Sequence, residues 1–243
     1  MIDINCDMGE LTTLLEDGTY EALMNHVTSI NIACGGHAGD EKMIRVMVET
    51  AKEKNVKIGA HPSYPDRKNF GRYEMDISDK KLSTSILEQI TKVINIAEEH
   101  NYSISHMKPH GALYNKAAND ESLATLIGET IKSINPSLPV MCLAGSKMVS
   151  TLKDMGLNVL RESFADRTYE ADGSLRKRVL SDALILNPQI AAMQAYNISK
   201  NNKLIAHDGT EITLQSETMC IHSDTPEALK IAIAVNNKLN RSQ

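Results

Sequence analysis

Tryptophan is absent from this chain, and aromatic residues make up only 4% of it. Stacking surfaces for sugar rings or bases are therefore sparse, which disfavours a carbohydrate enzyme with a deep sugar cleft. Basic residues are also in deficit, because 26 Lys and Arg stand against 31 Asp and Glu, for a formal charge of −5. A protein that binds nucleic acid needs a concentrated excess of positive charge, so nucleic acid is excluded as a partner.

Long apolar runs are missing as well. No run approaches the roughly 18 residues of a membrane helix, and the first residues lack the basic flank and apolar stretch of a signal peptide. We expect a cytoplasmic protein that does not interact with membranes. The four cysteines occur singly in apolar segments without a C-x-x-C pair, so we interpret them as small buried hydrophobic residues rather than as a zinc knuckle or disulfide framework.

Along the chain, short apolar runs alternate with longer segments of helical periodicity. This alternation is typical of βα units around a parallel sheet, and nothing marks a domain boundary, so we predict one α/β domain over residues 1–243. Met43, Met47 and Ala51 are spaced along one helix face, as are the apolar residues of 82–97, and Pro226 with Glu227 is typical of a helix start. Asp208-Gly209 predicts a hairpin between 203–206 and 211–214. The predicted strands are Ile2–Cys6, Ser29–Cys34, Val56–Ala60, Ile104–Lys108, Val140–Leu143, Asn158–Glu162, Ala183–Leu186 and Thr218–Ile221.

Polar residues gather directly after these strands. In parallel α/β folds the loops that follow the strands emerge on one side, where active sites are built, so residues far apart in sequence can converge there. Imidazole with a neighbouring carboxylate suits proton transfer at neutral pH, and the set fits hydrolysis or ring opening of a small polar molecule. The catalytic candidates are Asp7, Glu10, His37, His61, His110 and Asp166, and the substrate-binding candidates are Gly35, Gly36, Lys108, Asn115, Glu162, Arg167, Tyr169, Arg178 and His222.

Each candidate also has a purely structural interpretation. Asp7 and Glu10 could cap helices, a single histidine is more often hydrogen-bonded than catalytic, and the arginines could form ordinary ion pairs. It is the coincidence of so many polar residues at strand ends that favours a site. His106, inside a strand, is interpreted as packed; the remaining histidines, His26, His100 and His207, are interpreted as surface residues.

Several specific chemistries are missing from the sequence. It contains no G-x-x-x-x-G-K-[ST] phosphate loop, no H-E-x-x-H and no G-x-S-x-G, so ATP is not expected to bind through a phosphate loop here. A divalent metal remains open without being assigned, because Asp7, His61 and His110 from three strand ends could ligate one.

The strand-end clusters resemble those of the LamB/YcsF family, in order and over essentially the whole chain. The matching stretches are Ile4–Glu10, Asn31–Asp40, Ile58–Asp66, Lys108–Asn115, Phe164–Tyr169 and Cys220–His222. The resemblance implies an irregular (β/α) barrel of about seven parallel strands, similar to the glycoside hydrolase/deacetylase superfamily.

The resemblance also implies an activity. The family is similar in function to one component of a three-part bacterial 5-oxoprolinase, which opens 5-oxo-L-proline to L-glutamate while ATP is hydrolysed to ADP and phosphate. The expected partners are subunits B and C (PxpB and PxpC), which would bind the ATP. In our hypothesis His61 or His110 with Asp7 activates water, Lys108 and the amides of Gly35-Gly36 hold the anionic oxygen, and Arg167 or Arg178 binds the substrate carboxylate.

Two other functions stay open at this point. One is a metal-dependent deacetylase or amidohydrolase that needs no ATP, and the other is a non-catalytic subunit that binds the substrate for its partners. Self-association into a homo-oligomer is also left open.

Overall fold

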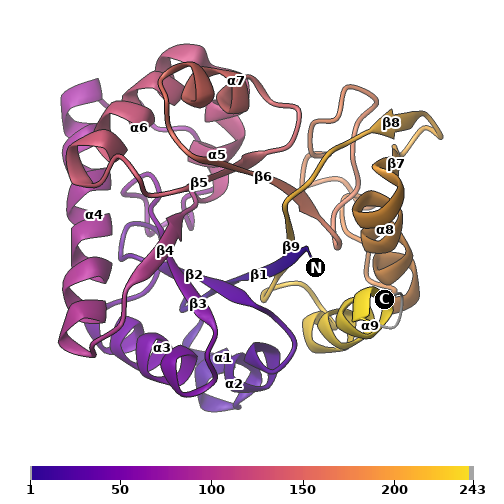
Figure 1. Ribbon diagram of the computed structural model, residues 1–243, viewed down its shortest axis with the longest axis horizontal. Helices are drawn as coiled ribbons and strands as arrows, with labels where there is room; N and C mark the ends of the chain where they lie inside the picture. Colours follow the sequence, from indigo (N-terminus) through magenta and orange to yellow (C-terminus); the bar gives the residue numbers. More distant parts are fainter. Residues whose placement is uncertain (1, 241–243) are drawn as a thin grey trace.

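Seven of the eight predicted strands form a closed, all-parallel barrel in the order β1-β2-β3-β4-β5-β6-β9. The computed structural model describes residues 2–240 (Figure 1). The parallel barrel confirms the predicted α/β barrel architecture. The strands are β1 (Asp3–Met8), β2 (Ser29–Ala33), β3 (Lys57–His61), β4 (Ile104–Met107), β5 (Val140–Leu143), β6 (Val159–Phe164) and β9 (Thr218–His222).

The predicted strand Ala183–Leu186 is wrong. Its residues run back along the loop that leaves β6, where Leu184 forms only an isolated antiparallel bridge with Arg167. A parallel strand needs a crossover of a dozen or more residues, usually a helix, and no helix separates this run from β6. The apolar run alone did not distinguish a strand from an apolar loop segment.

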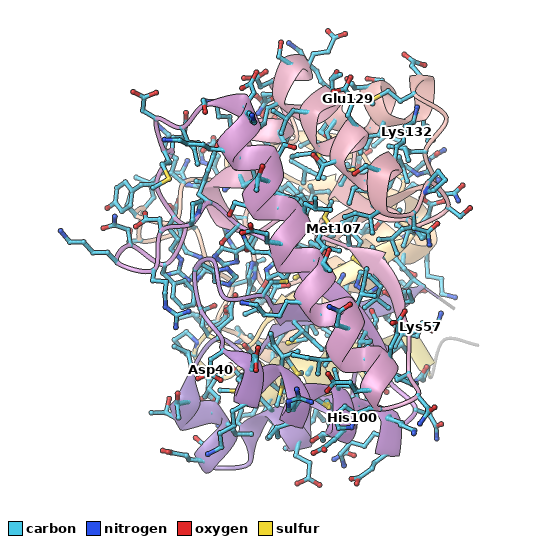
Figure 2. The ribbon with its side chains drawn as sticks, turned by 90° about the vertical axis from the view of Figure 1, so that its left-hand side faces the viewer. Asp40, Lys57, His100, Met107, Glu129 and Lys132 are labelled. Atoms are coloured by element: carbon cyan, nitrogen blue, oxygen red, sulfur yellow. The ribbon has the colours of Figure 1, made fainter. Side chains whose placement is uncertain are left out.

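The helices surround the barrel as an outer ring (Figure 1). Helix α3 buries Met43, Met47 and Ala51, and its N-cap Asp40 accepts a hydrogen bond from the Met43 amide at 2.8 Å. Figure 2 shows α4 lying across the barrel wall, where it packs on β3 and β4. The helices are α1 (Thr12–Glu16), α2 (Thr19–Met24), α3 (Glu41–Glu53), α4 (Asp79–Glu99), α5 (Gly111–Ala117), α6 (Glu121–Ile134), α7 (Lys147–Asp154), α8 (Pro188–Asn201) and α9 (Ala228–Asn240).

Both predicted apolar faces, on α3 and on α4, are confirmed. The last helix begins at Ala228, two residues later than predicted, because Glu227 has a positive φ of 65° that is incompatible with a helical start. Between β6 and β9 the chain adds α8 and the predicted hairpin, β7 (Lys203–Ile205) with β8 (Glu211–Thr213). Within residues 2–240, no helix has the length and apolar character to cross a membrane.

The interior of the barrel is polar at its centre. Asn5 on β1 donates hydrogen bonds to Glu162 on β6 at 3.0 Å and to Thr218 on β9 at 2.7 Å, and it accepts one from Asn31 on β2 at 2.8 Å. Because β6 is not a neighbour of β1, the contact with Glu162 crosses the barrel interior. Parallel barrels are normally filled by apolar side chains, so a hydrogen-bonded layer at this position is unusual.

His106 belongs to the same layer, which agrees with its interpretation as a packed residue. Its Nε2 lies 2.7 Å from Asn31 Oδ1, and its Nδ1 lies 2.8 Å from the Ser105 hydroxyl. Gly59 on the adjacent strand makes room for the ring, because a Cβ there would lie 2.2 Å from His106 Nε2. Burial lowers the pKa of His106 to about 4, so the ring is neutral. All four cysteines are buried and free, as predicted.

Candidate active site at the carboxyl ends of the strands

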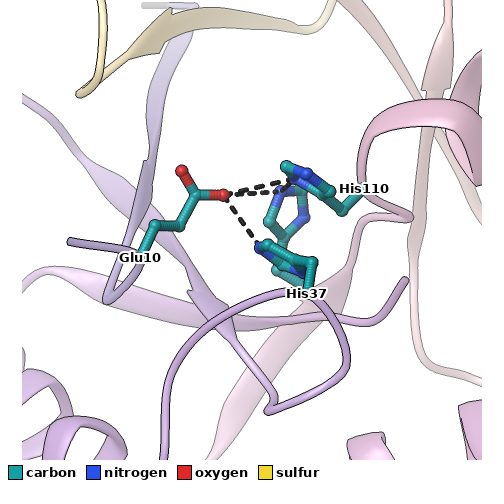
Figure 3. A group of neighbouring side chains, drawn as sticks. Glu10, His37 and His110 are labelled. Carbon is teal, nitrogen blue, oxygen red and sulfur yellow. Dashed lines mark hydrogen bonds and ion pairs between the residues drawn. The ribbon is translucent and has the colours of Figure 1, made fainter. Parts of the chain in front are cut away.

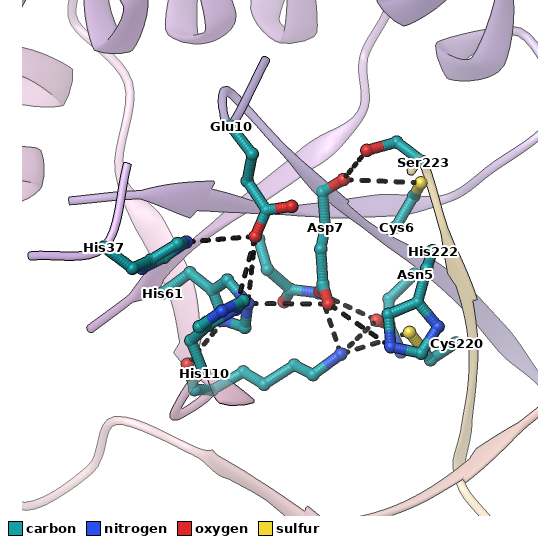
Figure 4. A network of polar contacts seen from close by, with 12 residues as sticks. Asn5, Cys6, Asp7, Glu10, His37, His61, His110, Cys220, His222 and Ser223 are labelled. Carbon is teal, nitrogen blue, oxygen red and sulfur yellow. Dashed lines mark hydrogen bonds and ion pairs between the residues drawn. The ribbon is translucent and has the colours of Figure 1, made fainter. Parts of the chain in front are cut away.

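Seven predicted site residues meet at the carboxyl ends of the barrel strands. They come from five strands or the loops that follow them, and they form one network of polar contacts (Figure 4). The network also joins the polar layer below it, since Asn31 donates to Asp7 Oδ1 at 2.8 Å. The seven residues are Asp7, Glu10, His37, His61, Lys108, His110 and His222.

Three histidines lie within 4 Å of one oxygen of the Glu10 carboxylate, and Figure 3 labels two of them, His37 and His110. Glu10 Oε1 lies 3.0 Å from His37 Nε2, 3.2 Å from His110 Nδ1 and 3.9 Å from His61 Nε2. His110 Nδ1 is also 3.0 Å from His61 Nε2. In two of the rings the nitrogen that points away from Glu10 donates a hydrogen bond to a backbone carbonyl. His61 Nδ1 donates to the carbonyl of Lys108 at 2.8 Å, and His110 Nε2 donates to that of Phe70 at 3.0 Å.

In this histidine cluster the Glu10 carboxylate lies against three buried imidazole rings. Burial lowers the pKa of His37 to about 3 and also lowers the pKa of His110. Burial acts to raise the pKa of Glu10, but its contacts with His110 and His37 outweigh burial and hold that pKa well below its usual range. Gly71 admits the two rings, because a Cβ there would lie 3.0 Å from His37 Cβ and 3.1 Å from His110 Cδ2.

Lys108 links two buried carboxylates below the histidine cluster. Its Nζ lies 2.8 Å from Asp7 Oδ1 and 2.9 Å from Glu162 Oε1. Burial opposes the ammonium charge, yet the carboxylates of Asp7 and Glu162, together with the Cys220 sulfur, raise the pKa of Lys108 well above its usual value. For Asp7, burial is likewise outweighed by His61 and Lys108, which hold its pKa low. The Lys108 ammonium group is therefore already bound to carboxylates inside the barrel. This does not favour its predicted role in holding a substrate oxygen.

His222 and Asp166 form a separate pair beside Asp7. His222 Nδ1 lies 3.0 and 3.1 Å from the two Asp166 oxygens, and Asp166 also accepts hydrogen bonds from the His222 amide and the Thr225 hydroxyl. Burial raises the pKa of Asp166, but His222 and Thr225 outweigh it and bring it to about 2. An ionised Asp166 fixes the proton on Nδ1, so that Nε2, 4.0 Å from Asp7 Oδ2, presents a lone pair.

His222 is also the most accessible member of the network. Its side chain is 15% exposed, against 8% or less for His37, His61 and His110. A partly exposed histidine whose tautomer is fixed by a buried carboxylate is the arrangement expected of a general base.

Two arginines stand at the mouth of the barrel around Asp224. Arg178 Nη1 lies 2.8 Å from Asp224 Oδ2, and Arg72 pairs with the same oxygen. Close by, a cavity of about 260 Å³ is lined by Glu10, His37 and Phe70 among others. Arg178 was predicted as a site residue from the sequence, whereas Arg72 and Asp224 were not. Both of these residues lie in loops that follow strands, and that position was the signal that could have identified them.

Besides Lys108 and Glu162, which form an ion pair with each other, five predicted substrate-binding residues lie elsewhere or already make other contacts. Arg167 donates to the carbonyls of Ala183 and Arg176, at 3.2 and 2.6 Å, and so holds its own loop together. The Tyr169 hydroxyl accepts a hydrogen bond from the Phe164 amide. Gly35 donates its amide to Ala38, Gly36 is packed against Gln89 and Ser63, and Asn115 is exposed on α5.

Two groups in the site have metal-ligating atoms within 4.8 Å of one another: Glu10 with His37, His61 and His110, and Asp7 with Cys220 and His222. In the second group, burial raises the pKa of the Cys220 thiol and Lys108 Nζ lies 3.1 Å from its sulfur, so a cation already occupies that position. The predicted set of Asp7, His61 and His110 is divided between the groups, because Asp7 is directed towards Lys108.

The fold and the network define a seven-stranded (β/α)-barrel protein with a largely buried cluster of acidic and basic side chains at the carboxyl ends of its strands. The chain belongs to the LamB/YcsF family, whose model matches residues 2–243. This finding confirms the resemblance drawn from the strand-end motifs.

Relatives match over nearly the full length. The 5-oxoprolinase A subunit of Chloroflexus aggregans is 43% identical over 238 residues, which cover 98% of this chain and 94% of that protein. The crystal structure of a lactam utilization protein from Thermus thermophilus is 34% identical, covers 99% of this chain and 96% of that chain, and has a TM-score of 0.91. A GH113 beta-1,4-mannanase, 10% identical with a TM-score of 0.53 over 98% of both chains, shares the fold alone.

Proposed function

We propose that this chain is the A subunit of an ATP-dependent 5-oxoprolinase, which hydrolyses 5-oxo-L-proline to L-glutamate together with partner subunits B and C in the cytoplasm. The observation that carries the proposal is the match to a 5-oxoprolinase A subunit over 98% of the chain. A lactam utilization protein with the same fold, at a TM-score of 0.91, supports the same substrate class.

The chemistry of the site suits the ring-opening step. A lactam is a poor electrophile, and phosphorylation of its oxygen by ATP makes the ring carbon open to attack by water. We assign ATP binding to the partner subunits, because the sequence has no G-x-x-x-x-G-K-[ST] phosphate loop. Attack then requires a base for the water, and breakage of the C–N bond requires a proton for the ring nitrogen.

We assign the base to His222. Its side chain is 15% exposed, and Asp166 both fixes its tautomer and stabilises the imidazolium that forms when it takes a proton from water. The imidazolium can return this proton to the ring nitrogen as the C–N bond breaks, which leaves a γ-glutamyl phosphate that a second water hydrolyses to glutamate and phosphate. This assignment departs from the sequence-based hypothesis, which placed the base at His61 or His110, because those rings are more deeply buried.

The substrate carboxylate is assigned to Arg178 and Arg72. Both guanidinium groups lie at the mouth and share one carboxylate oxygen of Asp224, so each has donors left for a planar carboxylate. Arg167, the other candidate, is tied to backbone carbonyls and does not take this role.

The decisive experiment measures glutamate and ADP formed from 5-oxo-L-proline and ATP. This chain alone, subunits B and C alone, and the mixture are assayed under the same conditions. We expect glutamate only in the mixture. Folded partners that form no glutamate with this chain would overturn the proposal.

The same assay tests the assigned base. His222→Ala should lower kcat by about 10²- to 10⁴-fold, the usual contribution of a general base, while the complex still assembles. The matched control is His207→Ala, since His207 is an exposed histidine in the hairpin segment. A His222→Ala enzyme with normal turnover would refute the base assignment and leave the 5-oxoprolinase proposal standing.

A further inference from the structure

We propose that Glu10, His61 and His110 bind a divalent transition-metal ion of the zinc class, with His37 holding Glu10 in place. Metal binding by the chain alone does not depend on the proposed function, and the two can fail separately.

The first argument concerns which atoms carry protons. Backbone carbonyls only accept hydrogen bonds, so His61 Nδ1 and His110 Nε2, which face the carbonyls of Lys108 and Phe70, must both be protonated. The opposite nitrogens, His61 Nε2 and His110 Nδ1, are then the ring atoms that can offer lone pairs to a metal ion. These two atoms face each other at 3.0 Å and both face the Glu10 carboxylate.

Three electron-rich atoms at these distances repel one another unless a cation lies between them. Ligating histidines commonly donate their other ring nitrogen to a carbonyl or carboxylate, which fixes the ring and its tautomer. Both His61 and His110 show this arrangement before any ion is considered.

The second argument is geometric. Ligands about 2.0–2.1 Å from a tetrahedral zinc ion lie about 3.3 Å from one another. The three separations here are 3.0 Å between the two ring nitrogens, 3.2 Å from Glu10 Oε1 to His110 and 3.9 Å from Glu10 Oε1 to His61. The His61 and His110 rings lie at 89° to each other, so one ion can lie close to both ring planes.

His37 does not satisfy this condition. Its ring stacks on His110 with centroids 3.6 Å apart and planes 1° apart, so an ion in the plane of one ring lies outside the plane of the other. We therefore assign His37 Nε2 as a donor to Glu10 Oε1, 3.0 Å away, and treat it as a positioning residue. Two histidines and one glutamate leave a coordination position open, which is the pattern of catalytic rather than structural zinc sites.

The ligand set differs from one built on Asp7. Asp7 Oδ1 accepts from Lys108 at 2.8 Å and from Asn31 at 2.8 Å, so its charge is already compensated. Its other oxygen lies 3.5 Å from His61 Nε2 and offers the nearest competing ligand. The variants Glu10→Gln and Asp7→Asn, both isosteric, distinguish the two sets.

The test is carried out on the purified chain without partners or substrate. Metal content is measured by mass spectrometry after purification without chelators, and the chelator-treated protein is titrated with Co²⁺ while its visible absorption is recorded. We expect about one metal ion per chain and the intense absorption of four-coordinate Co²⁺. Glu10→Gln and His110→Ala should lose stoichiometric metal, His37→Ala should bind about 10- to 100-fold more weakly, and Asp7→Asn and His207→Ala should bind as the wild type does.

Circular dichroism establishes that each variant is folded, and Glu10→Gln keeps the test usable if His110→Ala fails to fold. A wild-type chain that neither contains metal nor binds Co²⁺ or Zn²⁺ would overturn the proposal and leave a proton as the cation shared by the cluster. Loss of metal in Asp7→Asn but not in Glu10→Gln would overturn the ligand assignment.

Discussion

Replacement of Lys108 by methionine tests whether the charged centre of the barrel stabilises the fold. Lys108 is the cation that contacts both Asp7, at 2.8 Å, and Glu162, at 2.9 Å, and all three side chains are 5% exposed or less. Methionine keeps much of the volume and removes the charge. Two buried carboxylates would then lose their shared partner, and breaking a buried pair in this way destabilises a protein by about 3–5 kcal/mol.

The measurement is urea unfolding at pH 7, compared with Lys132→Met, because Lys132 is an exposed lysine on α6. We expect Lys132→Met to change the free energy of unfolding by less than about 0.5 kcal/mol. The double variant Lys108→Met/Glu162→Gln also removes the charge of Glu162, one of the two buried carboxylates left without a partner. It should therefore be more stable than Lys108→Met alone, by about 1 kcal/mol or more.

Two results would refute this reasoning. A loss below about 1 kcal/mol in Lys108→Met would mean that water or rearranged neighbours compensate the carboxylates without Lys108. Additive losses in the double variant would mean that Lys108 and Glu162 act independently, despite the 2.9 Å contact.

Three further predictions concern other parts of the site. Gly59→Ala should lower the free energy of unfolding by about 2–4 kcal/mol in urea titrations, because the new Cβ would lie 2.2 Å from His106 Nε2. Asp166 has a pKa of about 2, below its unfolded value of about 3.9, so the unfolded chain binds this proton first. Wild-type stability should therefore fall as the pH drops from about 4 towards 2, and Asp166→Asn should flatten that decline; an unchanged slope would contradict the prediction. Arg178→Ala should raise KM for 5-oxoproline by about tenfold or more, with a smaller effect on kcat, whereas Arg161→Ala, bound to Glu217 and Gln215, should not.

The convergence of the catalytic candidates could be predicted from sequence because it depends on topology. Once the strands are parallel, the loops after them must emerge on one side, and Asp7, Glu10, His37, His61 and His110 are brought together whatever the loop details. The same reasoning identified seven strands, whose apolar runs are flanked by helical segments. It was wrong for 183–186, where a loop segment has the composition of a strand.

Side-chain direction could not be predicted in the same way. Arg167 and Arg178 both lie in the segment between β6 and α8, yet Arg167 points to backbone carbonyls and Arg178 to Asp224. The difference is set by the path of a loop without regular secondary structure, which has no periodicity to indicate which residues face the site. The position of Lys108 inside the barrel likewise depends on the carboxylates of Asp7 on β1 and Glu162 on β6. Only the closed barrel brings these side chains into contact with Lys108.

The polar layer inside the barrel also has a consequence for how the strands align. Asn5 and Asp7 alternate on β1 with Ile4, Cys6 and Met8, and all five are buried. A shift of β1 by one residue would exchange the two sets, so that apolar side chains would face Glu162 while an amide and a carboxylate would enter the apolar layer beneath the helices. An apolar barrel would tolerate such a slip far better. The hydrogen bonds that support the site therefore also discriminate against misaligned barrels during folding.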